Sequence, residues 1–211
     1  MEKFFQKAFK IIGVLVLLVT LLSSCMKIML KVYGVKKPRV ENATSVKKKT
    51  LKFGLDTSNL VTVKSEAWLK TLKGQKLPDI AVFDSAGNYV EYRPTDTSCN
   101  AEVFDFISGL KPDLKLNRTG KTDSKTELSK FRDLKGREFV LNEKADFYVL
   151  IFYTVWLGRL NKDHVKVWED NARANKNCKI KVLKVNLDIQ EYWDKTERDK
   201  IIDILNKSKK S

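Results

Sequence analysis

The sequence predicts an α/β protein in which one mixed sheet is flanked by helices. Two apolar runs, Phe147–Tyr153 and 179–187, have the length and the aromatic or β-branched content of strands. A third segment, 77–90, places two apolar stretches around a turn of Asp, Ser, Gly and Asn, which predicts a β-hairpin. Helix-like spacing of apolar residues between these strands is the alternation typical of an α/β fold.

In the first half of the chain the elements follow from local patterns. Helical spacing covers 45–53, and the β-branched stretch 59–63 predicts a short strand. A second helix is expected over 65–74, with Ser65 as its candidate N-cap. After the hairpin, 100–110 is predicted to be a helix because its apolar residues fall on one face.

The second half opens with a polar stretch, 111–135, which we predict to be a linker or an exposed loop. A short strand is expected over 139–141. Helices are expected over 160–175 and 190–207, one before and one after the second apolar strand in the sequence. Asp188 is expected to cap the last of these helices.

The amino terminus has the pattern of an export signal. Lysines precede an apolar run, 11–22, and the chain then reads Leu-Ser-Ser-Cys up to Cys25. This ending resembles the lipobox of bacterial lipoproteins. The resemblance implies that 1–24 is a signal peptide, that Cys25 becomes the acylated first residue, and that 25–40 is a membrane-proximal tether.

The alternative is an uncleaved membrane anchor, because apolar residues continue past Cys25 at Met26, Ile28 and Leu30. The run 11–22 alone is too short to cross a bilayer, which takes about 20 residues. We therefore expect a lipid-anchored protein of the bacterial cell envelope, facing the periplasm from the outer membrane.

Composition narrows the possible partners. The formal net charge of +15 favours anionic surfaces such as phospholipid or lipopolysaccharide phosphates, or an acidic protein. Export to the envelope argues against nucleic acid, and a solubilising surface is the plainer interpretation of the charge. One histidine and three cysteines offer no clustered ligand set, so we predict neither a metal site nor a cofactor.

The strand Phe147–Tyr153 is followed closely by Trp156, Leu157, Gly158, Arg159 and Leu160, and then by a predicted helix. This layout resembles the active site of the thioredoxin family, whose motif reads Trp-Cys-Gly-Pro-Cys. Both cysteine positions hold leucine here. Dithiol exchange through this motif is therefore excluded on chemical grounds, because it needs a thiolate at the helix N-terminus and a second thiol.

The rest of the thioredoxin pattern lies upstream of the motif. Pro78 and the hairpin after it resemble the family's cis-proline and antiparallel hairpin. The resemblance implies that 41–110 and 136–211 are two halves of one thioredoxin-like sheet in permuted order. Two incomplete lobes, or an α+β domain with chance similarity, are the alternative. A wider resemblance is to a group of poorly characterised bacterial envelope lipoproteins with thioredoxin-like features. It rests on the lipobox and on the segments 33–38, 96–100 and 156–169.

These features predict a redox-inactive module that binds a protein or an envelope component. An apolar and basic contact surface would be formed by Trp156, Leu157, Arg159 and Leu160, unless Leu157 or Leu160 packs inside the domain. The enzymatic alternative uses Cys99, which precedes a predicted helix whose N–H groups would stabilise a thiolate. A monothiol redox or thiol-sensing site there competes with a purely structural cysteine.

Overall fold

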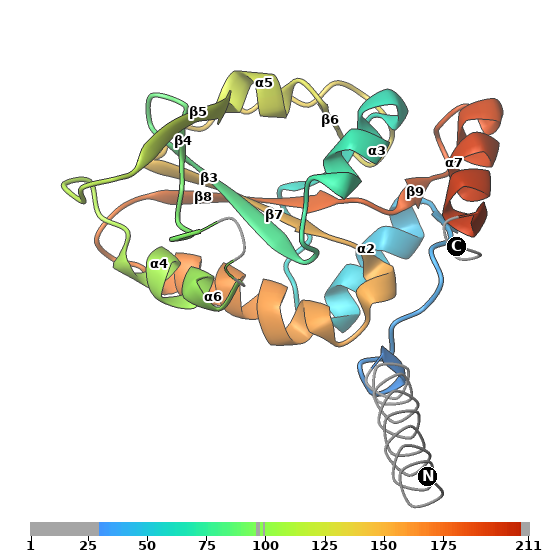
Figure 1. Ribbon diagram of the computed structural model, residues 1–211, viewed down its shortest axis with the longest axis horizontal. Coiled ribbons are helices and arrows are strands. Elements are labelled where there is room, and N and C mark those ends of the chain that lie inside the picture. The colour runs from blue at the N-terminus through green and yellow to red at the C-terminus, as the bar shows by residue number, and fades with distance from the viewer. Residues whose placement is uncertain (1–29, 96–97, 99, 208–211) are drawn as a thin grey trace, which may run out of the picture.

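The computed structural model describes residues 30–95, 98 and 100–207. The predicted fold class is confirmed: a seven-stranded mixed sheet has helices on both faces (Figure 1), which agrees with a thioredoxin-like α/β class. The signal segment 1–24, Cys25 and Cys99 lie outside the described residues. None of the helices described is long and apolar enough to cross a membrane.

Strand β7 (Phe147–Tyr153) is the centre of the sheet. It pairs in parallel with β8 (Ile180–Asn186) on one side and antiparallel with β3 (Asp79–Asp84) on the other. The remaining strands extend the sheet outward to give the order β5-β4-β3-β7-β8-β2-β6. Their bounds are β2 (Leu60–Val63), β4 (Asn88–Val90), β5 (Arg118–Asp123) and β6 (Phe131–Arg132).

The pairing of β3 with β7 unites the two halves of the chain in one sheet. It runs from Asp79 opposite Phe152 to Asp84 opposite Phe147. The hairpin strand β3 therefore lies beside the motif strand although it precedes it in sequence, which is the permuted arrangement that the sequence predicted. The peptide bond between Leu77 and Pro78, at the start of β3, is cis.

Both faces of the sheet are covered, so the central strand is buried at every residue except Tyr148, which is half-buried. Val149, Ile151 and Tyr153 of β7 belong to one hydrophobic cluster, and Leu150 and Phe152 to another. These five side chains have no exposed surface. This explains why β7 reads as a continuous apolar run rather than an alternating one.

The helices form a layer on each face. On one face, α3 (Ser65–Lys73) packs against α7 (Lys195–Lys207), with α5 (Ser124–Leu128) further along the sheet. On the other, α4 (Val103–Gly109) packs against α6 (Val167–Ala174), and α2 (Ala43–Lys52) lies near the motif. Two tryptophans, Trp68 and Trp193, meet edge to face under α3 and α7, with ring centroids 6.0 Å apart.

The polar stretch 111–135 was predicted to be a linker or an exposed loop. The structure instead places β5, α5 and β6 in it. Strand β5 lies at the edge of the sheet and largely faces solvent, so it lacks the apolar alternation that marks a half-buried strand. The predicted strand over 139–141 is absent from that described segment, and only Glu138 forms an isolated bridge, to Arg132.

Two capping predictions were also wrong. Ser65 is the first residue of α3, and the N-cap position is held by Lys64 without a side-chain bond. The last helix begins at Lys195, and the Asp194 carboxylate accepts the backbone N–H of Thr196 at 2.8 Å. Asp188 instead precedes a short strand, β9 (Ile189–Gln190), that the sequence did not predict.

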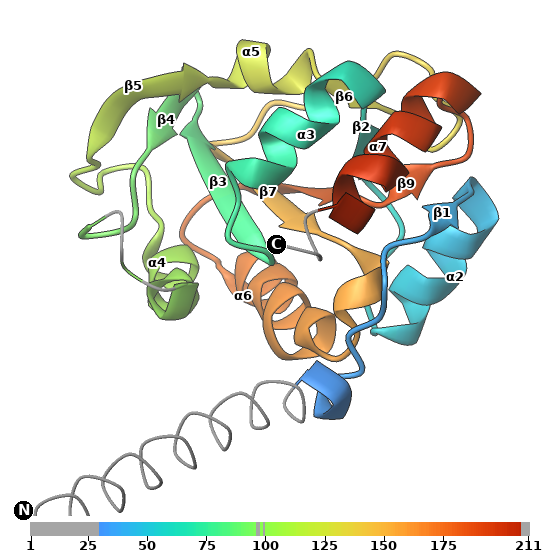
Figure 2. The ribbon, with the colours of Figure 1, turned by 45° about the vertical axis from the view of Figure 1, so that its right-hand side comes forward.

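The N-terminal segment is part of the fold. Its strand β1 (Val40–Glu41) pairs in parallel with β9, placing Val40 opposite Ile189 (Figure 2). The backbone N–H of Glu191 also bonds to the carbonyl of Glu41 at 2.8 Å. The end of the predicted tether is therefore fixed to the domain rather than free.

Candidate functional site

The motif lies at the carboxyl end of the central strand. After β7, Val155–Leu157 forms a single 3-10 turn, and Gly158 reverses the chain with a φ of 61°. Asn161–Lys166 then forms a short π-helical segment that continues into α6. Strand, turn and helix thus follow in the order that the motif predicts.

The motif side chains divide between interior and surface. Leu157 is only 6% exposed and packs inside, and Leu160 and Trp156 are half-buried. Arg159 is exposed and forms a weak surface ion pair with Asp163 at 3.4 Å. The apolar part of the predicted contact surface is therefore smaller than expected, because Leu157 does not contribute to it.

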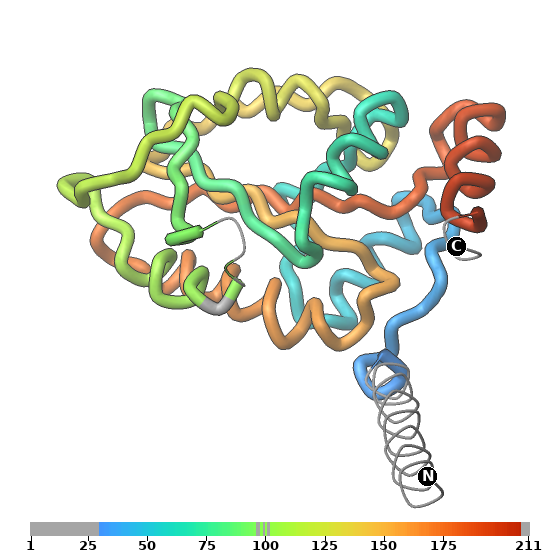
Figure 3. The backbone as a smooth tube through the Cα atoms, in the orientation of Figure 1, coloured from blue at the N-terminus to red at the C-terminus, as the bar shows by residue number. Residues whose placement is uncertain are grey.

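The N-terminal segment lies directly on the motif, as the backbone trace shows (Figure 3). The N–H of Arg159 donates to the carbonyl of Tyr33 at 2.7 Å, and the N–H of Lys36 donates to the carbonyl of Trp156 at 2.8 Å. A Cβ at Gly158 would come within 2.4 Å of the Tyr33 oxygen and 2.6 Å of the Gly34 oxygen. The glycine is thus required both by its dihedrals and by this approach.

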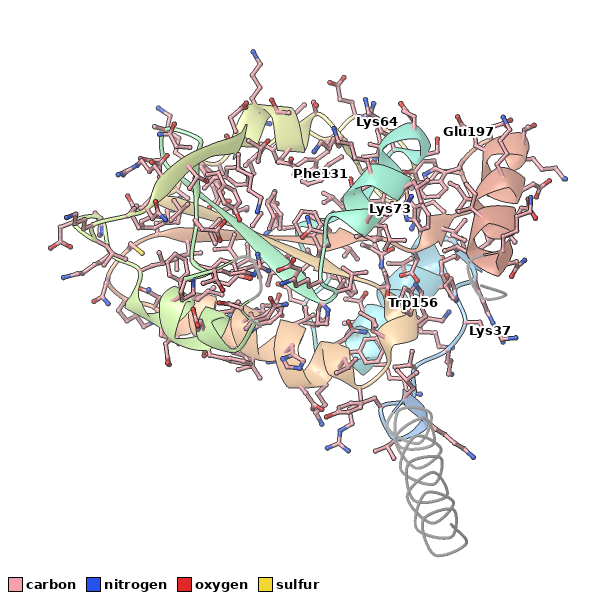
Figure 4. The ribbon with its side chains drawn as sticks, viewed as in Figure 1. Lys37, Lys64, Lys73, Phe131, Trp156 and Glu197 are labelled. Atoms are coloured by element: carbon pink, nitrogen blue, oxygen red, sulfur yellow. The ribbon has the colours of Figure 1, made fainter. Side chains whose placement is uncertain are left out.

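A groove of about 520 Å³ opens between this segment and the motif. Three parts of the chain line it: the segment 32–41, the end of α2 with Phe53 after it, and the motif with its following turn. Trp156 and Lys37 lie on the same side of the domain, where the N-terminal segment leaves it (Figure 4). The described lining of the groove contains one carboxylate, Glu41. It contains seven cationic side chains: Lys36, Lys37, Arg39, Lys49, Lys52, Arg159 and Lys162.

Sequence reasoning missed this groove. The run of lysines in α2 and the basic residues 36–39 were visible, but nothing local showed that they would face the motif. The turn at Tyr33 and Gly34 is held by backbone bonds, which have no side-chain signature. The one signal that the sequence offered at this turn was the glycine at position 34, which adopts a φ of 66° in the structure.

Beneath the groove lies a buried polar cluster centred on Asp188. Its Oδ2 accepts the N–H of Val155 at 2.8 Å and the Nδ2 amide of Asn186 at 2.6 Å. Gln190 donates to the side chain of Asn186 at 2.9 Å, and Asn161 donates to the carbonyl of Thr154 at 2.9 Å. The cluster therefore ties the start of the motif turn to the end of β8.

The charge state of this cluster is set by burial. Burial raises the pKa of the Asp188 carboxyl to about 7, against the bonds from Val155 and Asn186, which lower it. Buried oxygens with no partner in the described structure remain on Asp188, Asn161 and Gln190. A protonated Asp188 supplies a donor among these acceptors, whereas an ionised one adds an uncompensated buried charge.

The other predicted site residues that the structure describes do not line the groove. Pro78 immediately precedes β3, whose first residue pairs with Phe152 near the end of β7. The Pro78 carbonyl accepts the Asn100 side-chain amide at 2.6 Å. Asp79, next to Pro78, forms a buried ion pair with Arg93. Cys178 is half-buried, its thiol donates to the carbonyl of Leu110 at 3.3 Å, and burial raises its pKa.

The single histidine has no catalytic partner among the described residues. His164 lies on the π-helical segment, half-buried between the rings of Phe104 and Trp168. A search of the described residues finds no group of three or more His, Cys, Asp and Glu side chains that could hold a metal ion. The feature that the described residues do form at the motif is a basic groove.

Fold and site together define a mixed α/β protein with a basic groove beside the segment from Trp156 to Leu160. No protein-family model matches the chain, and searches of curated proteins and of solved structures also gave no match.

The raised pKa of Asp188 predicts a specific pH dependence of stability. The unfolded carboxyl titrates near pH 4, so between about pH 4 and 7 the folded chain holds the extra proton. Its contribution to the free energy of unfolding therefore falls as pH rises, by at most about 1.4 kcal/mol per pH unit. Asp188→Asn should remove this slope and stabilise the chain at pH 8, measured by urea unfolding. Parallel pH profiles for the two proteins would contradict this assignment.

Substitution of Gly158 tests the contact between the N-terminal segment and the motif. Gly158→Ala should lower the free energy of unfolding by about 1–3 kcal/mol, because alanine disfavours this backbone and would meet the Tyr33 carbonyl. Trypsin should then cut after Lys36 faster than in the parent chain. Gly109→Ala is the control, since a Cβ there meets nothing within 4 Å. Equal cleavage in both variants would show that the segment is not held at Gly158.

Proposed function

We propose that this protein is a lipid-anchored, redox-inactive binding module of the bacterial envelope. Its anchor is an acylated Cys25, and its ligand, an envelope component or a partner protein, binds in the groove beside the motif. One observation carries the proposal: the motif retains its place at the end of β7 and its Trp156, but its first cysteine position is a buried leucine, Leu157.

The chemistry of the motif supports binding rather than catalysis. Exchange with a disulfide needs an accessible thiolate, and neither Leu157 nor Leu160 can supply one. The groove is instead lined largely by cationic side chains such as Arg159, together with the half-buried ring of Trp156. Aromatic and arginine side chains are the residue types enriched where proteins bind ligands.

The second candidate is a monothiol redox or thiol-sensing protein that uses Cys99. It is favoured by the bond from the Asn100 side chain to the carbonyl of Pro78, because this bond attaches the residue next to Cys99 to the cis-proline. The thioredoxin resemblance implies that this proline lies at the site of exchange. A single thiol there could form a mixed disulfide but would lack a resolving partner.

A redox assay separates these two functions. The full chain should not reduce insulin with dithiothreitol as electron donor above the rate of Cys99→Ser, and its alkylation by iodoacetamide at pH 7 should show no fast phase. Measurable turnover that disappears in Cys99→Ser, but not in Cys178→Ser, would support the monothiol enzyme and refute the binding module.

The anchor is tested by lipidation. Cells that express the chain with labelled palmitate should incorporate label into the wild type, and the mature protein should begin at residue 25 by mass spectrometry. Cys25→Ser should lose the label, whereas Cys178→Ser should keep it. An unlabelled chain that retains residues 1–24 would instead indicate an uncleaved anchor.

A further inference from the structure

The charges of the groove are out of balance. Among the described residues that line it, the one carboxylate is Glu41, which is 5% exposed, paired with Lys49 and bonded by Ser45. Of the seven lining cations, Lys49 pairs with Glu41 and Arg159 pairs with Asp163. No ion pair in the described structure involves the remaining five, which are all exposed: Lys36, Lys37, Arg39, Lys52 and Lys162. Like charges gathered around one concave surface create a positive potential that an anion relieves.

The groove is not purely polar. Phe53 and Val155 line it together with Trp156, whose ring is half-buried. Val32, at its N-terminal edge, is 67% exposed, and the neighbouring Leu30 is 42% exposed. A ligand that combines an anionic group with an apolar part would use both kinds of surface, and tryptophan is enriched where apolar and polar phases meet.

The position of the groove along the chain indicates where such a ligand is found. Val32 follows Cys25 by seven residues, which can span at most about 25 Å. If Cys25 carries the anchor, as the proposed function holds, the groove lies within this distance of the bilayer. Basic residues so close to an anionic leaflet each gain about 1 kcal/mol of attraction.

We propose that this groove binds the phosphate group of an anionic phospholipid headgroup, with Lys36, Lys52 and Lys162 as phosphate contacts and Trp156 against the glycerol and the first acyl carbons. The inference rests on the proposed function, since it names the ligand of the same groove. It also assigns the three parts of the groove a common role, because each supplies one of the three lysines.

The tryptophans provide a direct measurement. The chain has four, and the other three, Trp68, Trp168 and Trp193, are buried at 4% exposure or less. The full lipidated chain in maltoside micelles, labelled with ¹⁵N-tryptophan, should show one indole signal that shifts on titration with dihexanoylphosphatidylglycerol. Trp156→Phe should delete that signal. Dihexanoylphosphatidylcholine and inorganic phosphate should each bind at least about tenfold more weakly.

Matched charge variants then locate the binding. Lys36→Gln, Lys52→Gln and Lys162→Gln combined should weaken phosphatidylglycerol binding by about tenfold or more, and raised salt should do the same to the wild type. The control removes three exposed lysines outside the groove, with Lys125→Gln, Lys144→Gln and Lys176→Gln, and should change binding less than about twofold. Lys144 and Lys176 lie at the opposite end of β7 and α6 from the motif.

Several results would overturn the inference. Equal binding of phosphatidylcholine, an equal loss in both triple variants, or a shift of the buried indoles would each refute a phosphate site in the groove. Equal binding of inorganic phosphate would remove the lipid as the source, and tighter binding of a glutamate-rich peptide would point to an acidic protein. If the chain is lipidated and redox-inactive but does not bind the phospholipid, this inference is refuted while the proposed function still stands.

Discussion

The pairing between β3 and β7 is the contact on which the rest of the structure depends. It joins a strand from the first half of the chain to one from the second, over six residue pairs, and places β7 between β3 and β8. Without it, the sheet would divide into β5-β4-β3 and β7-β8-β2-β6, and each part would have a newly open edge. The cis-proline, the motif turn and the N-terminal segment are all positioned relative to this central pair.

The strength of the local signal decided what the sequence could predict. Strand β7 was predicted because burial on both faces demands an unbroken apolar run. The cis peptide bond at Pro78 was expected only from the resemblance to the thioredoxin family. Strand β5 was missed since an edge strand with solvent on most of its surface carries no apolar periodicity. The burial of Asp188 was missed for a different reason: it depends on β9 and on β1, a strand almost 150 residues away in sequence.

The site shows the same division. The motif residues could be identified from the sequence, and the resemblance to the thioredoxin family implied which two leucines to compare with its thiols. The groove could not, because it is made by backbone bonds from Arg159 and Lys36 to a distant segment. The two findings are linked physically. The buried Leu157 supports a turn whose outer side contacts the N-terminal segment.

The attachment of that segment also sets how the domain responds to force. A pull on the N-terminus reaches the bond between Tyr33 and Arg159 first, then the bond between Lys36 and Trp156, and only then β1. The bonds are loaded in succession, as in the opening of a zipper, rather than together in shear. Tension would therefore act on the candidate binding groove before it reaches β1 and the strand β9 that pairs with it.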